Sequence, residues 1–502
     1  RHISLTSTSC SFSVSRTSKK VLAKPQLRTK AANENRSAFA VSTVSTGEVS
    51  FQASKDKALT PGESDALKFR LDPSVEHWKN WQFDESEFSS TSEVLTAAIQ
   101  QLSGAVERSG GLTSITAAAY WAYHIARNSF FGIQGATGII YSDLQQWLRT
   151  SGADRESSYS LGIGARIRLV CESYECFAQD IQNINKGIYK LPWDMTTLSH
   201  RQYNPLFVLG KASEFLEEAS LTLGRRKAQK QEPVWLQSDL YPDYYVSTFH
   251  YQTDGWFSSK SASIYETSTE TLFLGRQDAM QRQSLVPLHF WLQETRADPQ
   301  DLTLLEVGCG TGRFHTFIKD NYPSMRTAAL DLSPYYLQAA RDNVDYWRRI
   351  AGPSSAAPTA FLHAAAESVP MEDSSADVVM SVYMFHEMPR HAQEAAAAEM
   401  ARVLRPGGLL VLCDSIQRGD RPAFDGRITN FSRFNEPHYE AFVDADFGGM
   451  FEALGMRPYM KNMASSTKVL SFVKEAKVMP PPCDPPCARC DSKRREAHNA
   501  HR

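Results

Sequence analysis

The chain has 502 residues, of which 42% are hydrophobic and 22% charged, and its formal net charge is −2. This composition is typical of a globular protein, and the length exceeds what one hydrophobic core usually supports, so we expect two or more domains. The nearly balanced charge argues against a general nucleic-acid-binding protein, and no uninterrupted apolar stretch reaches membrane-spanning length.

The first 33 residues differ from the rest in composition. They are rich in Ser and Thr, carry many Lys and Arg, and contain no acid before Glu34. This pattern is typical of a transit peptide, and its Ser and Thr content favours the chloroplast over the mitochondrion; an ordinary disordered tail is the alternative. We expect residues 1–60 to be a disordered transit peptide and linker. Because the chain begins at Arg1 rather than Met, the true N-terminus can lie upstream.

A helical domain is predicted over residues 61–233. Residues 92–109, 164–189 and 205–226 space their apolar side chains at helical intervals. The stretch Ser114–Tyr141 is more apolar, but His124, Arg127, Asn128 and Gln134 interrupt it, so we expect a buried helix rather than a membrane span. The domain could shape a binding pocket or dimerise; it lacks the strongly basic face that would favour membrane docking.

The pattern changes after about Leu302. Short apolar runs at 302–307, 326–332, 359–364, 376–382 and 408–414 alternate with longer helical patterns, as in βαβ units. Two further runs, 456–463 and 467–473, are separated by three residues. That gap is too short for a parallel crossover, so we expect an antiparallel hairpin at one sheet edge. The sheet domain is predicted over 234–475, and the proline-rich tail 476–502 should be disordered.

A glycine-rich turn follows the first of these strands. Gly308, Gly310 and Gly312 are spaced G-x-G-x-G, and such a turn lets a ligand approach the backbone closely. A dinucleotide fold expects G-x-G-x-x-G, which holds a pyrophosphate. Here Glu306 lies two residues before the first glycine, and a carboxylate there suits a ligand with positive charge. S-adenosylmethionine fits this description, because it carries an ammonium and a sulfonium and no phosphate.

A second carboxylate supports this interpretation. Asp331 ends the next strand nineteen residues after Gly312, close to the spacing of about 20 expected for an acid that binds ribose hydroxyls. Ser333 and Pro334 then cap and open a helix. Together with the strand–helix alternation, these features argue against a simple tight turn.

From about Tyr265 to Lys474 the chain resembles the class I, seven-stranded, Rossmann-like S-adenosylmethionine-dependent methyltransferases. Residues 304–314, "LLEVGCGTGRF", resemble the first motif, and 329–341 the segment after the second strand. Residues 364–389 resemble the third and fourth motifs, and 399–415 the Pro-Gly-Gly turn and fifth strand. The subtype resembles the quinone C-methyltransferase group and, more closely, uncharacterised plastid proteins of plants and algae.

The resemblance implies an α/β fold with strand order 3-2-1-4-5-7-6 and an antiparallel last strand, preceded here by the all-α domain. It implies S-adenosylmethionine as the cofactor and no metal. The cofactor-binding residues that it carries over are Tyr265, Glu306, Gly308, Gly310, Gly312, Asp331, Leu332, Ala366 and Glu367. One position departs from the family, because Ala365 stands where an Asp often contacts adenine. Adenine contact would then fall to the Ala366 backbone or to Glu367.

The acceptor should lie where the strand order reverses, at the carboxyl ends of the first and fourth strands. The fourth strand leads into Tyr383, Phe385, His386 and Glu387. We predict His386 and Glu387 as the catalytic pair, with His386 as general base if the acceptor is a hydroxyl or an acidic carbon. Alternatively, His386 packs or caps a helix, and Glu387 caps the helix that begins near Pro389. Methyl transfer does not strictly require a base, since alignment in a dry cavity also accelerates it.

Two further segments could reach the acceptor. Tyr251, Asp254 and Trp256 either line its pocket or pack between the helical domain and the sheet. Between the fifth and sixth strands, the exposed candidates are Asn435, Glu436, His438 and Tyr439, whereas Phe442, Phe447, Phe451 and Leu454 should be core.

The sequence thus predicts a chloroplast methyltransferase for a small-molecule acceptor, for which a hydrophobic or aromatic compound is one option. A protein or nucleic-acid methyltransferase is a second possibility, but there is neither an N/D-P-P-Y/W motif after the fourth strand nor a basic stripe. A non-catalytic S-adenosylmethionine-binding interaction protein is the third. Cys483, Cys487 and Cys490 in the tail could bind zinc with His498, although a reduced flexible tail is the simpler interpretation. The sequence does not indicate which acceptor atom is methylated or what the oligomeric state is.

Overall fold

The computed structural model describes residues 59–83, 88, 90–149, 163–228, 239, 241–246, 254–429 and 436–476. These residues belong to one compact unit that spans residues 58–502. The predicted transit peptide and the C-terminal tail with its three cysteines lie outside the described residues, as do Tyr251 and Asn435.

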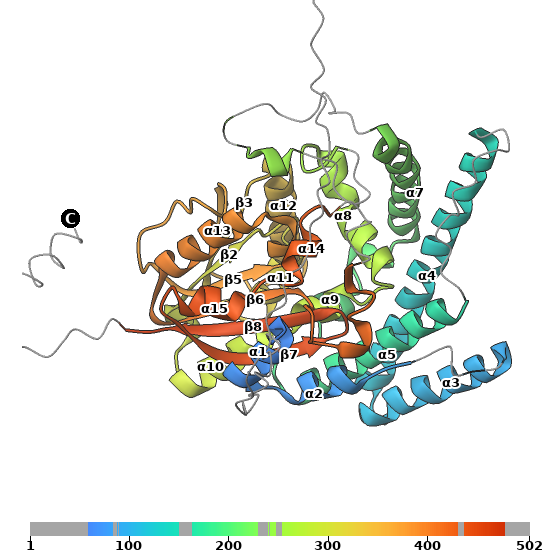
Figure 1. The fold of residues 1–502 in the computed structure, drawn as a ribbon, viewed down its shortest axis with the longest axis horizontal. Helices are drawn as coiled ribbons and strands as arrows, with labels where there is room; N and C mark the ends of the chain where they lie inside the picture. The colour runs from blue at the N-terminus through green and yellow to red at the C-terminus, as the bar shows by residue number, and fades with distance from the viewer. Residues whose placement is uncertain are drawn as a thin grey trace, which may run out of the picture. The chain divides into compact units, whose positions relative to one another are not determined.

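A mixed sheet of eight strands forms the centre of this unit (Figure 1). The strands are β1 Arg70–Leu71, β2 Thr303–Val307, β3 Arg326–Asp331, β4 Thr359–His363, β5 Ala376–Val382, β6 Leu404–Ser415, β7 Met456–Ala464 and β8 Thr467–Lys474. Their order is β1-β7-β8-β6-β5-β2-β3-β4, and only β8 runs antiparallel, to both β6 and β7. From β4 to β7 this is the predicted order 3-2-1-4-5-7-6, which confirms the Rossmann-like methyltransferase sheet.

The eighth strand comes from the region that was predicted to be purely helical. β1 pairs in parallel with β7, through Arg70 with Met460 and Leu71 with Lys461. The β7–β8 hairpin forms as predicted, but β1 covers its outer side, so the hairpin is not the sheet edge. A two-residue strand is too short to show a periodic pattern, and its pairing depends on the fold rather than on local sequence.

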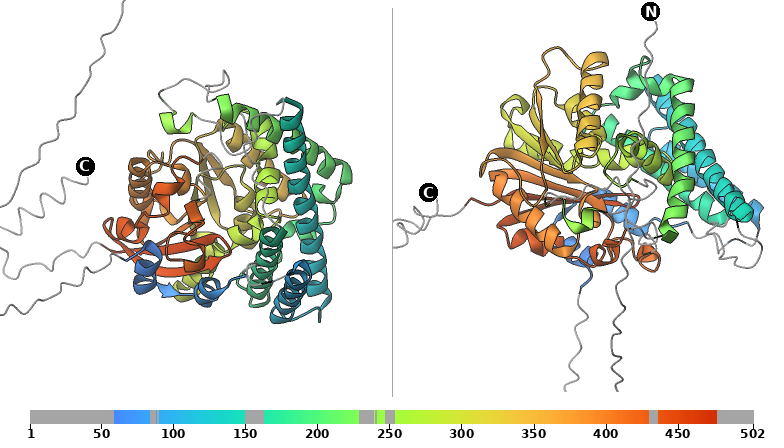
Figure 2. Two further views of the ribbon diagram at one scale, coloured as in Figure 1. Left: turned by 45° about the vertical axis from the view of Figure 1, so that its right-hand side comes forward. Right: turned by 90° about the horizontal axis from the view of Figure 1, so that it is seen from above.

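The described helices divide into two groups. Before the sheet come α1 Pro61–Lys68, α2 Pro73–Asn80, α3 Thr91–Arg108, α4 Ile115–Arg149, α5 Ile163–Asn185, α6 Trp193–Thr196 and α7 Pro205–Ala228. Around the strands lie α8 Ser259–Leu272, α9 Gln277–Arg282, α10 Leu285–Thr295, α11 Arg313–Asn321, α12 Pro334–Ile350, α13 Arg390–Val403, α14 Tyr439–Phe442 and α15 Phe447–Glu452. Figure 1 shows α3, α4, α5 and α7 on one side of the sheet, and Figure 2 gives two further views of the ribbon. Helix α3 packs beside α5, and α7 packs beside α4.

Helix α4 covers the stretch that was predicted to be a buried helix. One face is buried and includes Tyr120, Trp121, His124 and Asn128, whereas Ile115 on another face is 91% exposed. Polar side chains that interrupt the apolar stretch therefore point into the protein. Within the part of the chain that the structure describes, no helix has the length and hydropathy needed to cross a membrane.

The sheet and the helical region share one hydrophobic cluster. Alternate residues of β2 face opposite sides, with Leu305 in one cluster and Leu304 in another. The cluster around Leu305 also contains Trp78 of α2, Trp121 of α4 and Phe177 of α5. The predicted boundary at residue 233 stays a prediction, because residues 229–238 lie outside the described residues. The described helices of this region nevertheless pack as part of the sheet's own core.

Candidate cofactor and acceptor site

A cavity opens at the carboxyl ends of β2, β3 and β5, where the strand order reverses. Its empty volume is about 1120 Å³, counting space open to solvent. The lining consists of Tyr244, Tyr245, Trp256, Tyr265, Gln281, Glu306, Gly308, Cys309, Gly310, Thr311, Arg313, Phe314, Leu330, Asp331, Leu332, Ala364, Ala366, Glu367, Val382, Tyr383, Met384, Glu387, Met388 and Pro437.

The three predicted glycines serve different purposes. All have a left-handed backbone, with φ of 73° at Gly308, 54° at Gly310 and 72° at Gly312. A Cβ on Gly312 would lie 2.8 Å from the Cβ of Ala340 in α12, and one on Gly308 would lie 2.6 Å from the sulfur of Met384. A Cβ on Gly310 would meet no protein atom within 4 Å. Gly310 therefore faces open space in the cavity, whereas Gly312 does not line the cavity and allows α12 to pack closely.

Asp331 lies at the end of β3 and organises this turn. Its carboxylate accepts hydrogen bonds from the backbone N–H of Gly310 at 2.7 Å and of Ser333 at 2.8 Å. Ser333 caps α12 as predicted, with its side chain accepting from the N–H of Tyr336. Burial raises the pKa of Asp331 to about 6, although the two backbone donors oppose the shift.

Glu306 lines the cavity, and a buried histidine contacts its carboxylate. His315 of α11 contacts it, with Nδ1 2.8 Å from Oε2, and the other ring nitrogen lies 3.0 Å from the hydroxyl of Thr327. Burial raises the pKa of Glu306, and the contact with His315 opposes that shift. The sequence predicted the position of Glu306 but not this histidine partner, which lies on the buried face of the following helix.

Three more of the predicted cofactor-binding residues lie together at the cavity. Leu332, Ala366 and Glu367 all line the cavity, together with Ala364. The hydroxyl of Tyr244, which the sequence analysis did not single out, donates to Oε1 of Glu367 at 2.6 Å. Glu367 therefore has a fixed orientation beside the cavity.

Aromatic side chains form one wall of the cavity. Tyr265 of α8 lies there as predicted, and its ring centroid is 5.5 Å from that of Tyr336. Trp256 also lines the cavity and stacks on Tyr245 at 5.6 Å with an interplanar angle of 11°. Of the two open possibilities for Trp256, lining a pocket is the one observed, whereas Asp254 does not line the cavity.

His386 and Glu387 follow β5 in a short 3₁₀ turn, Phe385–Glu387. Glu387 lines the cavity, but His386 does not, so the structure does not place His386 against a bound acceptor. Its Nδ1 lies 2.6 Å from Oδ1 of Asp414 in β6, and its Nε2 lies 3.2 Å from Oε1 of Glu387. Burial alone would lower the pKa of His386, but the two carboxylates outweigh it and hold that pKa well above 6.5.

These contacts bear on the alternatives for His386 and Glu387, and the rings of Tyr439 and Phe442 pack against His386. The N-cap residue of α13 is Pro389, which makes no side-chain cap. Both ring nitrogens of His386 lie beside carboxylates, and His386 does not line the cavity. His386 is thus a candidate positioning residue, and Glu387 is the member of the predicted pair that can reach an acceptor.

The segment before α14 is more buried than predicted. Glu436 is 4% exposed and Tyr439 2%, although both were expected to be exposed candidates. Tyr439 packs against the ring of His386 at 6.1 Å. Phe442, Phe447 and Phe451 are core residues as predicted, and Leu454 is partly buried against them.

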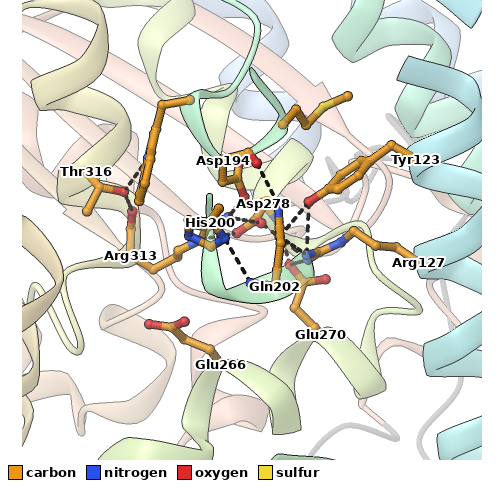
Figure 3. A network of polar contacts seen from close by, with 12 residues as sticks. Tyr123, Arg127, Asp194, His200, Gln202, Glu266, Glu270, Asp278, Arg313 and Thr316 are labelled. Atoms are coloured by element: carbon orange, nitrogen blue, oxygen red, sulfur yellow. Dashed lines mark hydrogen bonds and ion pairs between the residues drawn. The ribbon is translucent and has the colours of Figure 1, made fainter. Parts of the chain in front are cut away.

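A polar network connects the helical region to the glycine turn (Figure 3). Arg313, the first residue of α11, donates to Asp278 at 2.7 Å and to Asp194 at 2.5 Å. Arg127 of α4 lies 3.4 Å from Asp278 and 2.9 Å from Glu270. Asp194 of α6 therefore holds the residue that immediately follows Gly312, and Arg127 of α4 is linked to that residue through their shared partner Asp278.

The charge of the cavity distinguishes among ligands. Among the described residues, its lining includes the acids Glu306, Asp331, Glu367 and Glu387, and one base, Arg313. Arg313 is already paired with two aspartates, as described above. Carboxylates repel a pyrophosphate and attract an ammonium or sulfonium, so the electrostatics favour a cationic ligand.

Comparison with known proteins agrees with this geometry. Residues 305–412 match the family model of the methyltransferase domain. The fatty-acid O-methyltransferase of Mycolicibacterium smegmatis is 29% identical over 160 residues, which are 31% of this chain and 52% of that protein. The 2-methyl-6-phytyl-1,4-hydroquinone methyltransferase of a Synechocystis strain is 35% identical over 123 residues, 24% of this chain and 35% of that protein.

Among solved structures, the magnesium protoporphyrin IX methyltransferase of Synechocystis with bound S-adenosylhomocysteine aligns over 40% of this chain and 84% of its own, with 15% identity and a TM-score of 0.31. The family match and the relatives support the predicted enzyme class, a methyltransferase that uses S-adenosylmethionine. The chain spans about half or less of the length of these two curated relatives, so the activity of the whole protein is proposed below.

Proposed function

We propose that this chain is an S-adenosylmethionine-dependent methyltransferase that acts on a small hydrophobic or aromatic acceptor in the chloroplast. The observation that carries the proposal is the joint geometry of Gly310 and Asp331. Gly310 leaves open space at the cavity floor, and Asp331 holds the turn through the Gly310 N–H. When bound, the cofactor would supply a methyl group on a sulfonium, an already activated electrophile.

The residues present fit that group. Asp331 offers carboxylate oxygens at the distance along the chain expected for ribose hydroxyls, and Glu306 offers a second acid near the turn. Glu367 and the Ala366 backbone are available for adenine, in place of the Asp that Ala365 replaces. The acidic lining supports a cationic ligand over a dinucleotide.

The remaining cavity supports a hydrophobic or aromatic acceptor. Tyr245, Trp256 and Tyr265 supply flat rings with polar edges, which bury apolar groups and can orient an aromatic one. Met384 and Met388 add adaptable apolar surface. The named relatives act on a fatty acid and on a prenylated hydroquinone, so both acceptor classes are reasonable probes.

The chain's own contribution to the reaction would be alignment and exclusion of water. The aromatic wall and the loop after β5 would hold the acceptor against the cofactor side. Glu387, which lines the cavity, could accept a proton from an acceptor hydroxyl, and His386 with Asp414 would orient it. A carboxylate oriented in this way suits O-methylation or C-methylation of a phenol, and we propose the quinone-type acceptor first.

Calorimetry with S-adenosylmethionine and with NAD tests the cofactor. We expect binding of the first and no detectable binding of the second; the reverse result would overturn the proposal. Transfer of labelled methyl into a fatty acid, a prenylated hydroquinone and a plastid lipid extract then tests the acceptor. Alkaline hydrolysis of the product distinguishes methyl esters, which release label, from C-methyl products, which retain it.

The plastid location rests on the acid-free, Ser- and Thr-rich residues 1–33. A fluorescent protein fused after residue 60 should enter chloroplasts. The matched control replaces four of the basic residues in this segment by Glu and should stay outside. Import of both fusions, or of neither, would contradict the proposed plastid location.

A further inference from the structure

We propose that His386, Glu387 and Glu436 bind a divalent transition-metal ion at the acceptor side of the cavity. The three side chains come from the turn after β5 and from the segment before α14. One ligand atom of each, a histidine nitrogen or a carboxylate oxygen, lies within 4.8 Å of the other two. His386 and Glu436 are buried, at 7% and 4% exposure.

The orientation of His386 supports the proposal. Its Nδ1 faces Asp414 at 2.6 Å, and the carboxylate of Asp414 also accepts from the N–H groups of Phe385 and Ser415. Metal-binding histidines commonly direct their other ring nitrogen at a carboxylate in this way, which fixes the ring and leaves one nitrogen for the metal. In His386 that remaining nitrogen is Nε2, which faces Glu387.

The separation of two of the three ligands also suits a shared ion. Two ligands bound at about 2.1 Å and roughly 100° apart lie about 3.2 Å from each other, which is the separation of His386 Nε2 and Glu387 Oε1. An ion at this point would be held by the carboxylates of Glu387 and Glu436 as well as by the imidazole.

The donor set indicates the kind of ion. One imidazole and two carboxylates suit Mn²⁺, Fe²⁺ or Zn²⁺ better than Mg²⁺ or Ca²⁺, which prefer oxygen ligands alone. Three protein ligands leave coordination positions free. Because Glu387 and Pro437 line the cavity, a free position can face the acceptor. The ion would then bind an acceptor oxygen; this role rests on the proposed function, but binding of the ion does not.

Mn²⁺ is the appropriate probe, because it disfavours the thiolates of the C-terminal cysteines. Its binding to the full chain is measured by electron paramagnetic resonance and by calorimetry, with S-adenosylmethionine binding measured separately on the same preparation. We expect one site that the nearly isosteric Glu436→Gln substitution weakens more than tenfold. Asp414→Asn should weaken it about 10- to 100-fold. Glu440→Gln, an exposed acid four residues after Glu436, should leave it unchanged.

Either of two results overturns the inference: no Mn²⁺ site in the wild-type chain, or equal affinity in the Glu436→Gln and Glu440→Gln variants. Thermal unfolding of each variant shows whether it is folded. If Glu436→Gln unfolds, the inference is decided by the Asp414→Asn variant and by the wild-type Mn²⁺ signal. If the proposed cofactor is wrong, the separate measurement will show no binding of S-adenosylmethionine, whatever the result with Mn²⁺. The two failures are therefore distinguishable.

Discussion

Substitution of Gly310 by alanine separates cofactor binding from folding. The new Cβ would contact no protein atom within 4 Å, so it causes no clash in the free protein. The cost to stability is the left-handed backbone at φ 54°, which is about 1–2 kcal/mol for a residue with a Cβ. The methyl group, however, would occupy the space through which a ligand approaches the turn.

The chain contains a close control for this change. Gly407 also has a left-handed backbone, with φ 77°, and a Cβ there would come no nearer than 4.0 Å to another group, the guanidinium of Arg405. It lies in the turn inside β6 and does not line the cavity. Gly407→Ala should therefore lose the same 1–2 kcal/mol of stability and retain the cofactor. Gly312→Ala should lose more, because its Cβ would overlap Ala340.

The magnitude for binding follows from overpacking. Forcing one extra methyl group against a bound ligand costs about 2 kcal/mol, which is roughly a 30-fold loss of affinity. Calorimetry with S-adenosylmethionine on Gly310→Ala and Gly407→Ala, together with urea unfolding of both, measures the two quantities. If Gly310→Ala binds within twofold of Gly407→Ala, the ligand does not approach the turn, and the reasoning fails.

Three further outcomes are expected. Because burial raises the pKa of Asp331 to about 6 and ribose hydroxyls require its ionised form, cofactor affinity should rise about tenfold from pH 5 to pH 7; a slope unchanged in Asp331→Asn would refute this. Arg127→Met leaves Glu270 and Asp278 without this partner and should cost about 3 kcal/mol in urea unfolding, whereas a loss below 1 kcal/mol would show that the network contributes little. His386→Ala should retain cofactor binding yet slow turnover, and unchanged turnover would make this histidine purely structural.

The strands that could be predicted carry their signal locally. Buried strands such as β2, β3 and β5 are short apolar runs between turns, and their observed bounds lie within a residue or so of the predicted ones. β1 could not be predicted, because two residues have no period and their pairing with β7 joins segments far apart in sequence.

The site divides in the same way. The glycine turn and Asp331 are recognisable because they lie at fixed distances along one βαβ unit. The contact of Arg313 with Asp194 joins residues 119 apart, and a charged residue in the sequence does not reveal which opposite charge it will meet. The same limit applies to His386, whose partner Asp414 lies on the neighbouring strand, 28 residues away.

The position of Gly312 in the motif does not by itself assign its role. Gly312 was predicted to bind the cofactor, and the structure gives a packing reason for its missing side chain, which is the close approach of Ala340. A glycine in a motif indicates that a side chain does not fit at that position. It does not show whether a ligand or another part of the protein occupies the space. Only the positions of α11 and α12 distinguish the two reasons.

A crystal structure with S-adenosylhomocysteine tests the central claim most directly. We predict that the ribose hydroxyls bind the carboxylate of Asp331 and that the adenine lies beside Ala366 and Glu367. The homocysteine part of the ligand should pass over Gly310. A ligand bound elsewhere, or a cavity that takes up a dinucleotide with its pyrophosphate on the glycine turn, would contradict the account.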